Sequence, residues 1–118
     1  MKDISEIEDI EMLVAKFYDK LLEDSVTKEK FQHLNIESHL PRIVDFWAFV
    51  LLEKAGYSTN VFEKHIHLNL ESIHFTSWLK NWADTVNEMF EGTKADLAIQ
   101  RANLLAYTFQ SKLKENNG

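Results

Sequence analysis

The stretch HFTSWLKNWADTVNEMFEG, residues 74–92, decides the fold class. Its apolar side chains recur at steps of three and four residues, at Phe75, Trp78, Leu79, Trp82, Val86, Met89 and Phe90. This period places them on one face of an amphipathic helix. Gly92 is a residue type that commonly ends a helix, and Thr93 with Asp96 is a typical start of the next one. The stretch therefore predicts a long helix that leads directly into another.

The same period recurs elsewhere in the chain. One stripe comprises Ile7, Ile10, Val14, Phe17 and Leu21; a second comprises Leu40, Ile43, Val44, Trp47, Val50 and Leu51; a third comprises Ala98, Ala102, Leu105, Phe109 and Leu113. Residues 27–33 and 61–66 each predict one or two helical turns. Ser5 with Glu8 is a capping-box pair, and Pro41 requires its helix to start close to Ser38 or to bend. We expect an all-α fold with four long and two short helices.

The composition supports this fold and excludes several classes of protein. The chain has 118 residues, a size typical of one domain, and its three glycines and one proline are too few for a β-sandwich or barrel. A net charge of −6 without a basic run argues against nucleic-acid binding. The lack of cysteine excludes disulfides and thiolate metal sites. Because no apolar stretch approaches ~20 residues and no signal-peptide pattern is present, we expect one cytoplasmic domain, residues 1–118, without a membrane span.

Five histidines are the first candidates for chemistry. The sequence has no HExxH zinc motif, no glycine-rich phosphate loop and no serine in the turn that exposes a nucleophile. His65 and His67 form an H-x-H pair, but two such residues on a helix diverge by about 200° and do not easily bind one ion. A metal site at this pair is therefore the weaker interpretation. The stronger one is that one histidine packs and the other meets water.

Tyr18, His39 and Trp78 are polar side chains on apolar helix faces. Taken singly, each residue is more often a core residue whose polar tip finds a partner. Their combination with a second inward histidine in residues 62–66 changes this interpretation. One imidazole on one side of a flat apolar cofactor, with a tyrosine, a histidine and a tryptophan on the other, is the arrangement of a haem pocket.

With these residues the chain resembles the truncated haemoglobins, and specifically their third group. The resemblance covers almost the whole length, from about residue 8 to residue 113. It rests on FYDK at 17–20, SHLP at 38–41, DFW at 45–47, FEKH at 62–65, HFTSWL at 74–79 and QRA at 100–102. No single stretch is specific, but their order and spacing are. The family implies a two-over-two helical globin that binds one haem b.

The resemblance also implies a role for four polar residues. His65 matches the proximal iron ligand, and Tyr18 matches the distal tyrosine of the first long helix. His39 matches the histidine beside the gas-binding site, and Trp78 matches the tryptophan that closes the distal pocket. The other residues implied to hold the haem are the walls Phe31, Ile43, Phe46, Trp47, Phe62, Leu68 and Trp82, with Arg42 and Lys64 as candidates for the propionates.

The segment that follows His65 departs from the family pattern. It reads IHLNL at 66–70, where relatives usually carry prolines. His67 and His74 therefore remain competitors for the proximal position. His65 is favoured because it precedes Trp78 by thirteen residues, close to the family spacing. His74 would lie one turn before Trp78 on the same helix, too near the distal side.

The resemblance implies binding of dioxygen and related diatomic gases, including nitric oxide and carbon monoxide. Bound dioxygen carries negative character, so the Tyr18 hydroxyl and the Trp78 indole N–H would stabilise it, while His39 would add a third donor or act as a gate to solvent. Strong retention favours ligand trapping or redox detoxification over oxygen transport. As an enzyme, the protein would have a nitric oxide dioxygenase or peroxidase-like activity, with electrons from an unidentified reductase. The alternative is a cofactor-free helical interaction domain.

Overall fold

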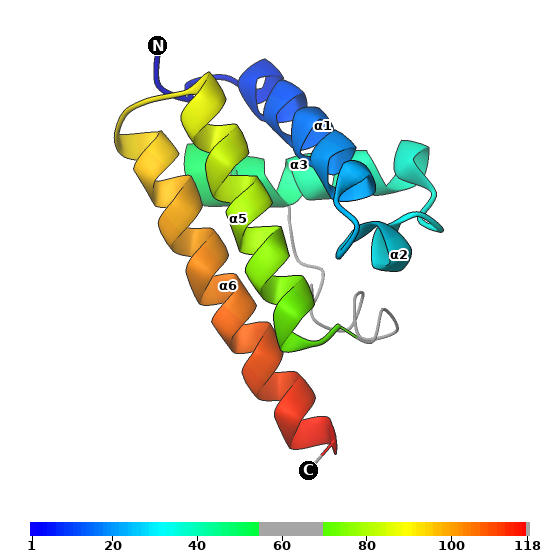
Figure 1. The fold of residues 1–118 in the computed structure, drawn as a ribbon. Helices are drawn as coiled ribbons and strands as arrows, with labels where there is room; N and C mark the ends of the chain where they lie inside the picture. The colour runs from blue at the N-terminus through cyan, green and yellow to red at the C-terminus, as the bar shows by residue number, and fades with distance from the viewer. Residues whose placement is uncertain (55–69, 118) are drawn as a thin grey trace.

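The computed structural model describes residues 1–54 and 70–117, and it confirms the predicted all-α class. Its helices are α1 (Ile7–Glu23), α2 (Lys28–Phe31), α3 (Ile36–Leu52), α5 (Ser72–Met89) and α6 (Thr93–Asn117), as Figure 1 shows. Four of these are long, one is short, and the described part of the chain contains no strand. The second short helix, predicted at 61–66, lies outside the described residues. None of the described helices is both long and apolar enough to span a membrane.

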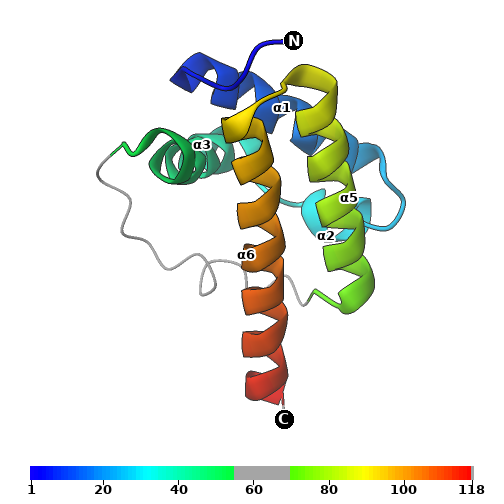
Figure 2. The same ribbon diagram turned by 90° about the vertical axis from the view of Figure 1, so that its left-hand side faces the viewer.

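The long helices form two packed pairs. α1 packs against α3, and α5 runs antiparallel to α6 along most of its length (Figure 1). The pairs are joined by contacts of α1 with α5 and of α3 with α6. Figure 2 looks nearly along α3 while α6 runs down the picture, so that the pairs cross. This arrangement is the two-over-two helical sandwich that the family resemblance implies.

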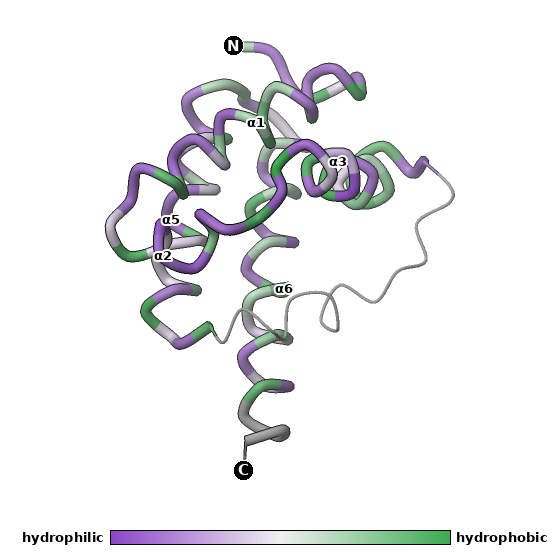
Figure 3. Tube along the Cα trace, turned by 90° about the vertical axis from the view of Figure 1, so that its right-hand side faces the viewer, coloured by the Kyte–Doolittle hydropathy of each residue, from purple (hydrophilic) through white to green (hydrophobic). Residues whose placement is uncertain are grey.

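The core lies where the two pairs cross, and the sequence stripes supply it. Buried apolar residues in it are Ile10, Leu13, Val14, Phe17 and Leu21 of α1, Val44, Trp47 and Leu51 of α3, Trp82 and Val86 of α5, and Ala98 and Ala102 of α6. Figure 3 shows apolar and polar residues alternating around each helix, as amphipathic helices require. The small alanines of α6 allow α5 to approach closely.

The structure corrects the predicted cap of one helix and locates the start of another. The cap of α1 is centred on Asp9 rather than on Ser5 with Glu8: the Asp9 Oδ2 atom accepts hydrogen bonds from the backbone N–H groups of Ser5 and Glu6, both at 3.0 Å. α3 begins at Ile36, two residues before Ser38, and Pro41 lies inside it. The Asn35 side chain, which accepts a bond from the N–H of Ser38 at 3.4 Å, moves this start forward.

The N-terminal segment ties the first residues of the chain to the start of α6. Both carboxylate oxygens of Asp3 accept hydrogen bonds from α6 backbone N–H groups, from Lys94 and Ala95, each at 2.9 Å. Asp3 therefore satisfies donors of the first turn, a role that the sequence pattern gave to Thr93. Gly92, immediately before α6, has φ of +139°. The buried side chain of Ile4 fixes the segment on the core.

Candidate functional site

An apolar cavity opens between the two helix pairs. It has a volume of about 50 Å³ and is partly open to solvent. All four long helices, together with Phe31 of α2, contribute side chains to its wall. The described lining residues are Phe17, Tyr18, Phe31, Ile43, Phe46, Trp47, Leu70, Phe75, Trp78, Leu105, Ala106 and Phe109. This wall is almost entirely aromatic and aliphatic.

Tyr18 lines this cavity and is hydrogen-bonded to His39, which is not among the described lining residues. The Tyr18 hydroxyl lies 2.7 Å from His39 Nε2, and the two rings meet edge to face with centroids 5.3 Å apart. Tyr18 is 4% exposed, because the apolar face of α1 turns it inward. Burial raises the pKa of the Tyr18 phenol, so its hydroxyl keeps its proton at neutral pH and remains a donor. The structure thus brings together two of the predicted distal residues.

Trp78 is the third predicted distal residue and forms part of the same wall. Its indole packs edge to face on Phe17, with centroids 5.7 Å apart, and lies parallel to Trp82 at 6.5 Å. The ring is half-buried. Within the described part of the chain its indole N–H has no hydrogen-bond partner, and no described buried polar side-chain atom is left unpaired. The N–H is therefore accessible and available to a bound molecule.

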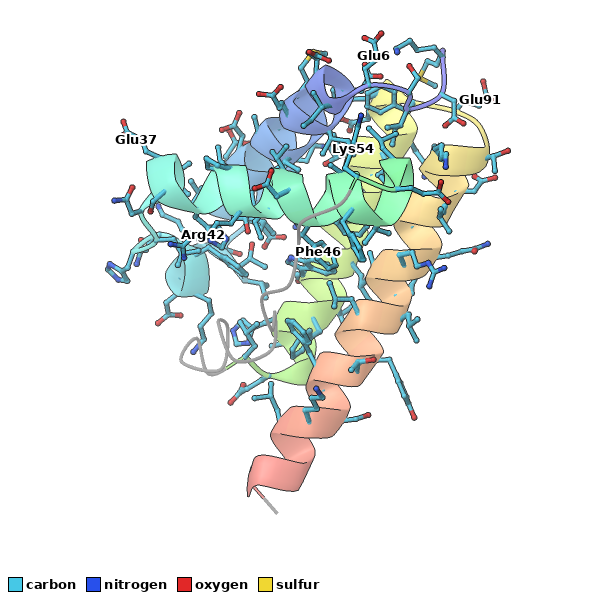
Figure 4. All side chains as sticks on the ribbon, turned by 180° about the vertical axis from the view of Figure 1, so that it is seen from behind. Glu6, Glu37, Arg42, Phe46, Lys54 and Glu91 are labelled. Carbon is cyan, nitrogen blue, oxygen red and sulfur yellow. The ribbon has the colours of Figure 1, made fainter. Side chains whose placement is uncertain are left out.

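Four of the predicted haem-wall residues line the cavity: Phe31, Ile43, Phe46 and Trp47. Phe46 points from α3 toward the space beside α5, as Figure 4 shows from behind the molecule. Arg42 is exposed and does not line the cavity. The remaining predictions, Phe62, Lys64, His65 and Leu68, lie outside the described residues, as does His67.

Trp82, also predicted as a wall residue, occupies a different position. It does not line the cavity but lies one layer behind, fully buried. Its ring stacks on Trp47 with centroids 4.5 Å apart, and its indole N–H donates to the carbonyl oxygen of Ala98 at 3.0 Å. The helical period that aligns Trp82 with Trp78 places both on the inner face of α5. It does not distinguish the cavity wall from the core behind it.

His74 has a structural role that bears on its candidacy as an iron ligand. Its Nδ1 atom accepts a hydrogen bond from the backbone N–H of Glu71 at 2.9 Å, at the start of α5. The ring proton of the neutral imidazole therefore lies on Nε2, and that nitrogen has no free lone pair for a metal. Its position at the helix start explains a buried histidine without a metal. No described group of three or more His, Asp or Glu residues is placed to hold a metal ion.

Half of the cavity wall was not assigned to the site from the sequence. The additional residues are Phe17, Leu70, Phe75, Leu105, Ala106 and Phe109. Most belong to apolar stripes that predicted buried helix faces. Phe75 and Phe109 meet edge to face at 6.5 Å across α5 and α6, a pairing that requires the antiparallel register of these helices. An apolar stripe in the sequence predicts which face of a helix is buried. Only the register of one helix against another shows which of the buried residues border a cavity.

Known proteins support the architecture in sequence and in structure. The chain is 27% identical to the group 3 truncated haemoglobin ctb of Campylobacter jejuni, over 94% of this chain and 93% of that protein. It is 30% identical to a group 1 truncated haemoglobin of Tetrahymena pyriformis, over 85% of this chain and 82% of that protein. A crystal structure of a group III truncated haemoglobin from Campylobacter jejuni superposes with a TM-score of 0.84 at 27% identity, covering 96% of this chain and 95% of that one. No family model matches the chain.

The crossed helix pairs and the aromatic cavity between them define a globin of reduced size. The chain belongs to the truncated haemoglobin family, and the matches that cover almost its whole length are to group III of that family.

Proposed function

We propose that the protein binds haem b in the aromatic cavity and uses it to bind diatomic gases. The observation that carries this proposal is that Tyr18, hydrogen-bonded to His39 behind it, and Trp78 are the polar side chains in an otherwise apolar described wall. The relatives that share the fold are themselves named truncated haemoglobins. Polar groups concentrated in an apolar cavity are the usual signature of a ligand site.

The lining of the cavity suits a flat apolar cofactor. Aromatic rings from α1, α3 and α5, including Phe17, Phe46 and Phe75, supply broad apolar surfaces. His65 is proposed as the iron ligand by its match to the family motif, and Arg42 and Lys64 as partners of the propionates. Bound haem supplies an iron atom at which dioxygen, nitric oxide or carbon monoxide binds.

The chain's own residues supply proton donors to the gas. The Tyr18 hydroxyl carries one proton, and in the structure its oxygen lies at hydrogen-bond distance from His39 Nε2. Where His39 Nε2 accepts that proton, turning it toward a ligand gives up the bond to His39; where Nε2 carries the ring proton and donates to the Tyr18 oxygen, the hydroxyl proton reaches a ligand without that loss. Trp78 needs no such exchange, because its N–H has no partner among the described residues. The tautomer of His39 therefore decides whether Tyr18 replaces a bond or adds one, whereas Trp78 adds one in either case.

This donor set favours retention over transport. Each hydrogen bond to a neutral acceptor contributes about 1 kcal/mol, and more when the acceptor is charged. We infer that dioxygen is released slowly and that the site serves ligand trapping or redox detoxification. Redox turnover of that kind requires electrons from a reductase, which is the partner we propose.

The absorption spectrum of the purified protein tests the proposal directly. A Soret band, or its appearance when hemin is added in equimolar amount to colourless protein, is the expected result. The competing function is a cofactor-free helical interaction domain. A folded protein that stays colourless and does not bind hemin would favour that alternative.

The role of His65 needs its own variant. His65→Ala is expected to lose haem affinity or the five-coordinate ferrous spectrum, because an iron ligand is removed. His67→Ala and His74→Ala are the matched controls and are expected to retain both. An unchanged iron–histidine stretching band in His65→Ala would transfer the role to another histidine.

A further inference from the structure

We propose that Trp82 is a positioning residue that fixes the Trp78 indole in the cavity wall and so sets the direction of its N–H. The inference rests on the proposed function, in which Trp78 faces the bound gas. Trp82 does not line the cavity and is fully buried, so any effect on a ligand passes through another side chain.

Trp82 is held in one orientation by the backbone of α6. Its indole N–H donates to the carbonyl oxygen of Ala98 at 3.0 Å, in a region fully closed to solvent. Rotation of the ring would leave a buried donor unpaired, which is costly in an apolar interior. Ala98 and Ala102 are fully buried and small, which leaves room for the large ring against α6. The position of Trp82 is therefore set by main chain rather than by mobile side chains.

This fixed ring contacts both tryptophans of the cavity wall. Trp47 stacks on it with centroids 4.5 Å apart and planes 19° apart, and Trp78 lies parallel at 6.5 Å with planes 6° apart. Phe17 meets Trp82 and Trp78 edge to face, at 5.0 Å and 5.7 Å and with interplanar angles of 82° and 81°. Such aromatic contacts are directional. Among the described residues, the plane of Trp78 is thus defined by two ring neighbours, one parallel and one perpendicular.

The direction of the Trp78 N–H matters because hydrogen bonds weaken steeply with angle. Phe17 alone leaves the indole free to slide along its edge. Trp82 supplies the parallel surface that removes this freedom. Its replacement by a smaller ring would leave Trp78 in the wall but with a less defined N–H direction. The effect should be specific to ligands that accept hydrogen bonds.

The first test uses the full chain as purified, kept under carbon monoxide. Its three tryptophans give three indole N–H signals in a nitrogen–proton NMR spectrum, which single Trp→Phe variants assign. We expect the Trp82 proton to exchange with solvent at least about tenfold more slowly than the Trp78 proton, because only the former is bonded and enclosed. Equal exchange would overturn the proposal, and this measurement needs no variant that folds poorly.

The second test is Trp82→Phe in the same spectrum. We expect the Trp78 signal to move or broaden. The matched control is Phe90→Leu, another buried aromatic residue of the core that makes no described ring contact with a tryptophan. An unchanged Trp78 signal in Trp82→Phe, or equal changes in both variants, would overturn the proposal, since the latter would indicate general loosening of the core.

Gas release connects the position of Trp78 to the ligand. In haem-loaded Trp82→Phe we expect dioxygen dissociation to accelerate about three- to tenfold, while carbon monoxide dissociation changes less than about twofold. Equal responses of the two gases, or no response, would overturn the proposal. If wild-type protein binds no hemin, the proposed function fails, whereas the NMR comparison still decides the position of Trp78.

Discussion

Asp3 lies so close to Gly92 that a Cβ atom at position 92 would meet the Asp3 Cγ at 2.6 Å. The same carboxylate accepts the N–H groups of Lys94 and Ala95, so the glycine clears the space in which the cap of α6 is made. Positive φ at Gly92 adds a second reason for glycine there. The two positions therefore act as one structural unit, although they stand at opposite ends of the sequence.

Asp3→Ala should lower the free energy of unfolding by about 1–2 kcal/mol, because it removes a cap that satisfies two helix N–H groups. Denaturant unfolding measures the change. Asp96→Ala is the matched control: it also removes a negative charge from the first turn of α6, but from an exposed position, and should cost less than about 1 kcal/mol. Equal losses of unfolding free energy in the two variants would show that Asp3 acts only through its negative charge and not through its hydrogen bonds.

Gly92→Ala should destabilise the protein by about 1–3 kcal/mol, through a strained φ and the displaced Asp3 side chain. The double variant Asp3→Ala with Gly92→Ala should lose less than the sum of the single changes, because both disrupt the same cap. Thermal or denaturant unfolding of wild type, the two single variants and the double variant gives the double-mutant cycle. Strict additivity would show that the two residues act independently.

From the lowered pKa of Asp9 we expect the free energy of unfolding to fall in acid. Burial opposes its ionisation, but hydrogen bonds from Lys2, Ser5 and Glu6 outweigh this and lower its pKa from 3.8 to about 2. Because the folded pKa lies below the unfolded one, the stabilisation is complete above pH 3.8 and is lost as the pH falls toward about 2. Asp9→Asn should flatten the fall of unfolding free energy in this window.

The control for this experiment is Asp19→Asn, an exposed aspartate on the same helix. It should leave the acid slope of the unfolding free energy close to that of wild type. Asp3 and Asp24 also have lowered pKa values: for Asp3, N–H donors outweigh burial, and for Asp24, the hydrogen bond from Asn81 is the largest cause. Some acid sensitivity will therefore remain in Asp9→Asn. An acid slope identical to that of wild type would contradict the assignment to Asp9.

Tyr18→Phe and Trp78→Phe should each accelerate dioxygen release from haem-loaded protein, by about tenfold for each 1.4 kcal/mol lost. The Trp78 change should have the larger effect if the Tyr18 hydroxyl donates to His39 Nε2, and the two changes should have similar effects if Nε2 donates to the Tyr18 oxygen. Carbon monoxide carries less negative charge and should respond weakly. Stopped-flow dissociation of both gases measures this. If neither variant accelerates oxygen release, the donor mechanism is wrong.

Local sequence patterns predicted the helices well, because each stripe reports only on its own segment. They could not predict which distant groups meet. Nothing near Thr93 indicates that Asp3 caps α6, since the two lie some ninety residues apart and are joined only by the packed fold. Likewise, Pro41 predicted a start of α3 close to Ser38, but not that capping by Asn35 would set it at Ile36, with five helical residues before the proline.

The candidate site shows the same division. Residue types and family spacing led to Tyr18 and His39, and the structure finds them hydrogen-bonded, although no local pattern specifies a contact between helices. Trp78 and Trp82 are indistinguishable by helical period. Only the packing of α6 against α5 shows that Trp82 bonds to Ala98 while Trp78 borders the cavity. Depth within a core depends on the neighbouring element, which a period cannot supply.

Pro41 divides α3 into a first turn and a longer remainder that differ in local stability. Pro41 has no N–H to donate to the carbonyl oxygen of Glu37, one turn earlier. One of the backbone hydrogen bonds that join the first turn to the rest of α3 is therefore missing. His39 stands on that first turn, and its own N–H bonds back to Asn35. Opening of this turn need not unfold the remainder of α3. Amide hydrogens of residues 38–40 should therefore exchange through a local opening that costs less free energy than the opening that exposes residues 44–51. His39, the partner of Tyr18, lies in the part of α3 that should exchange more readily.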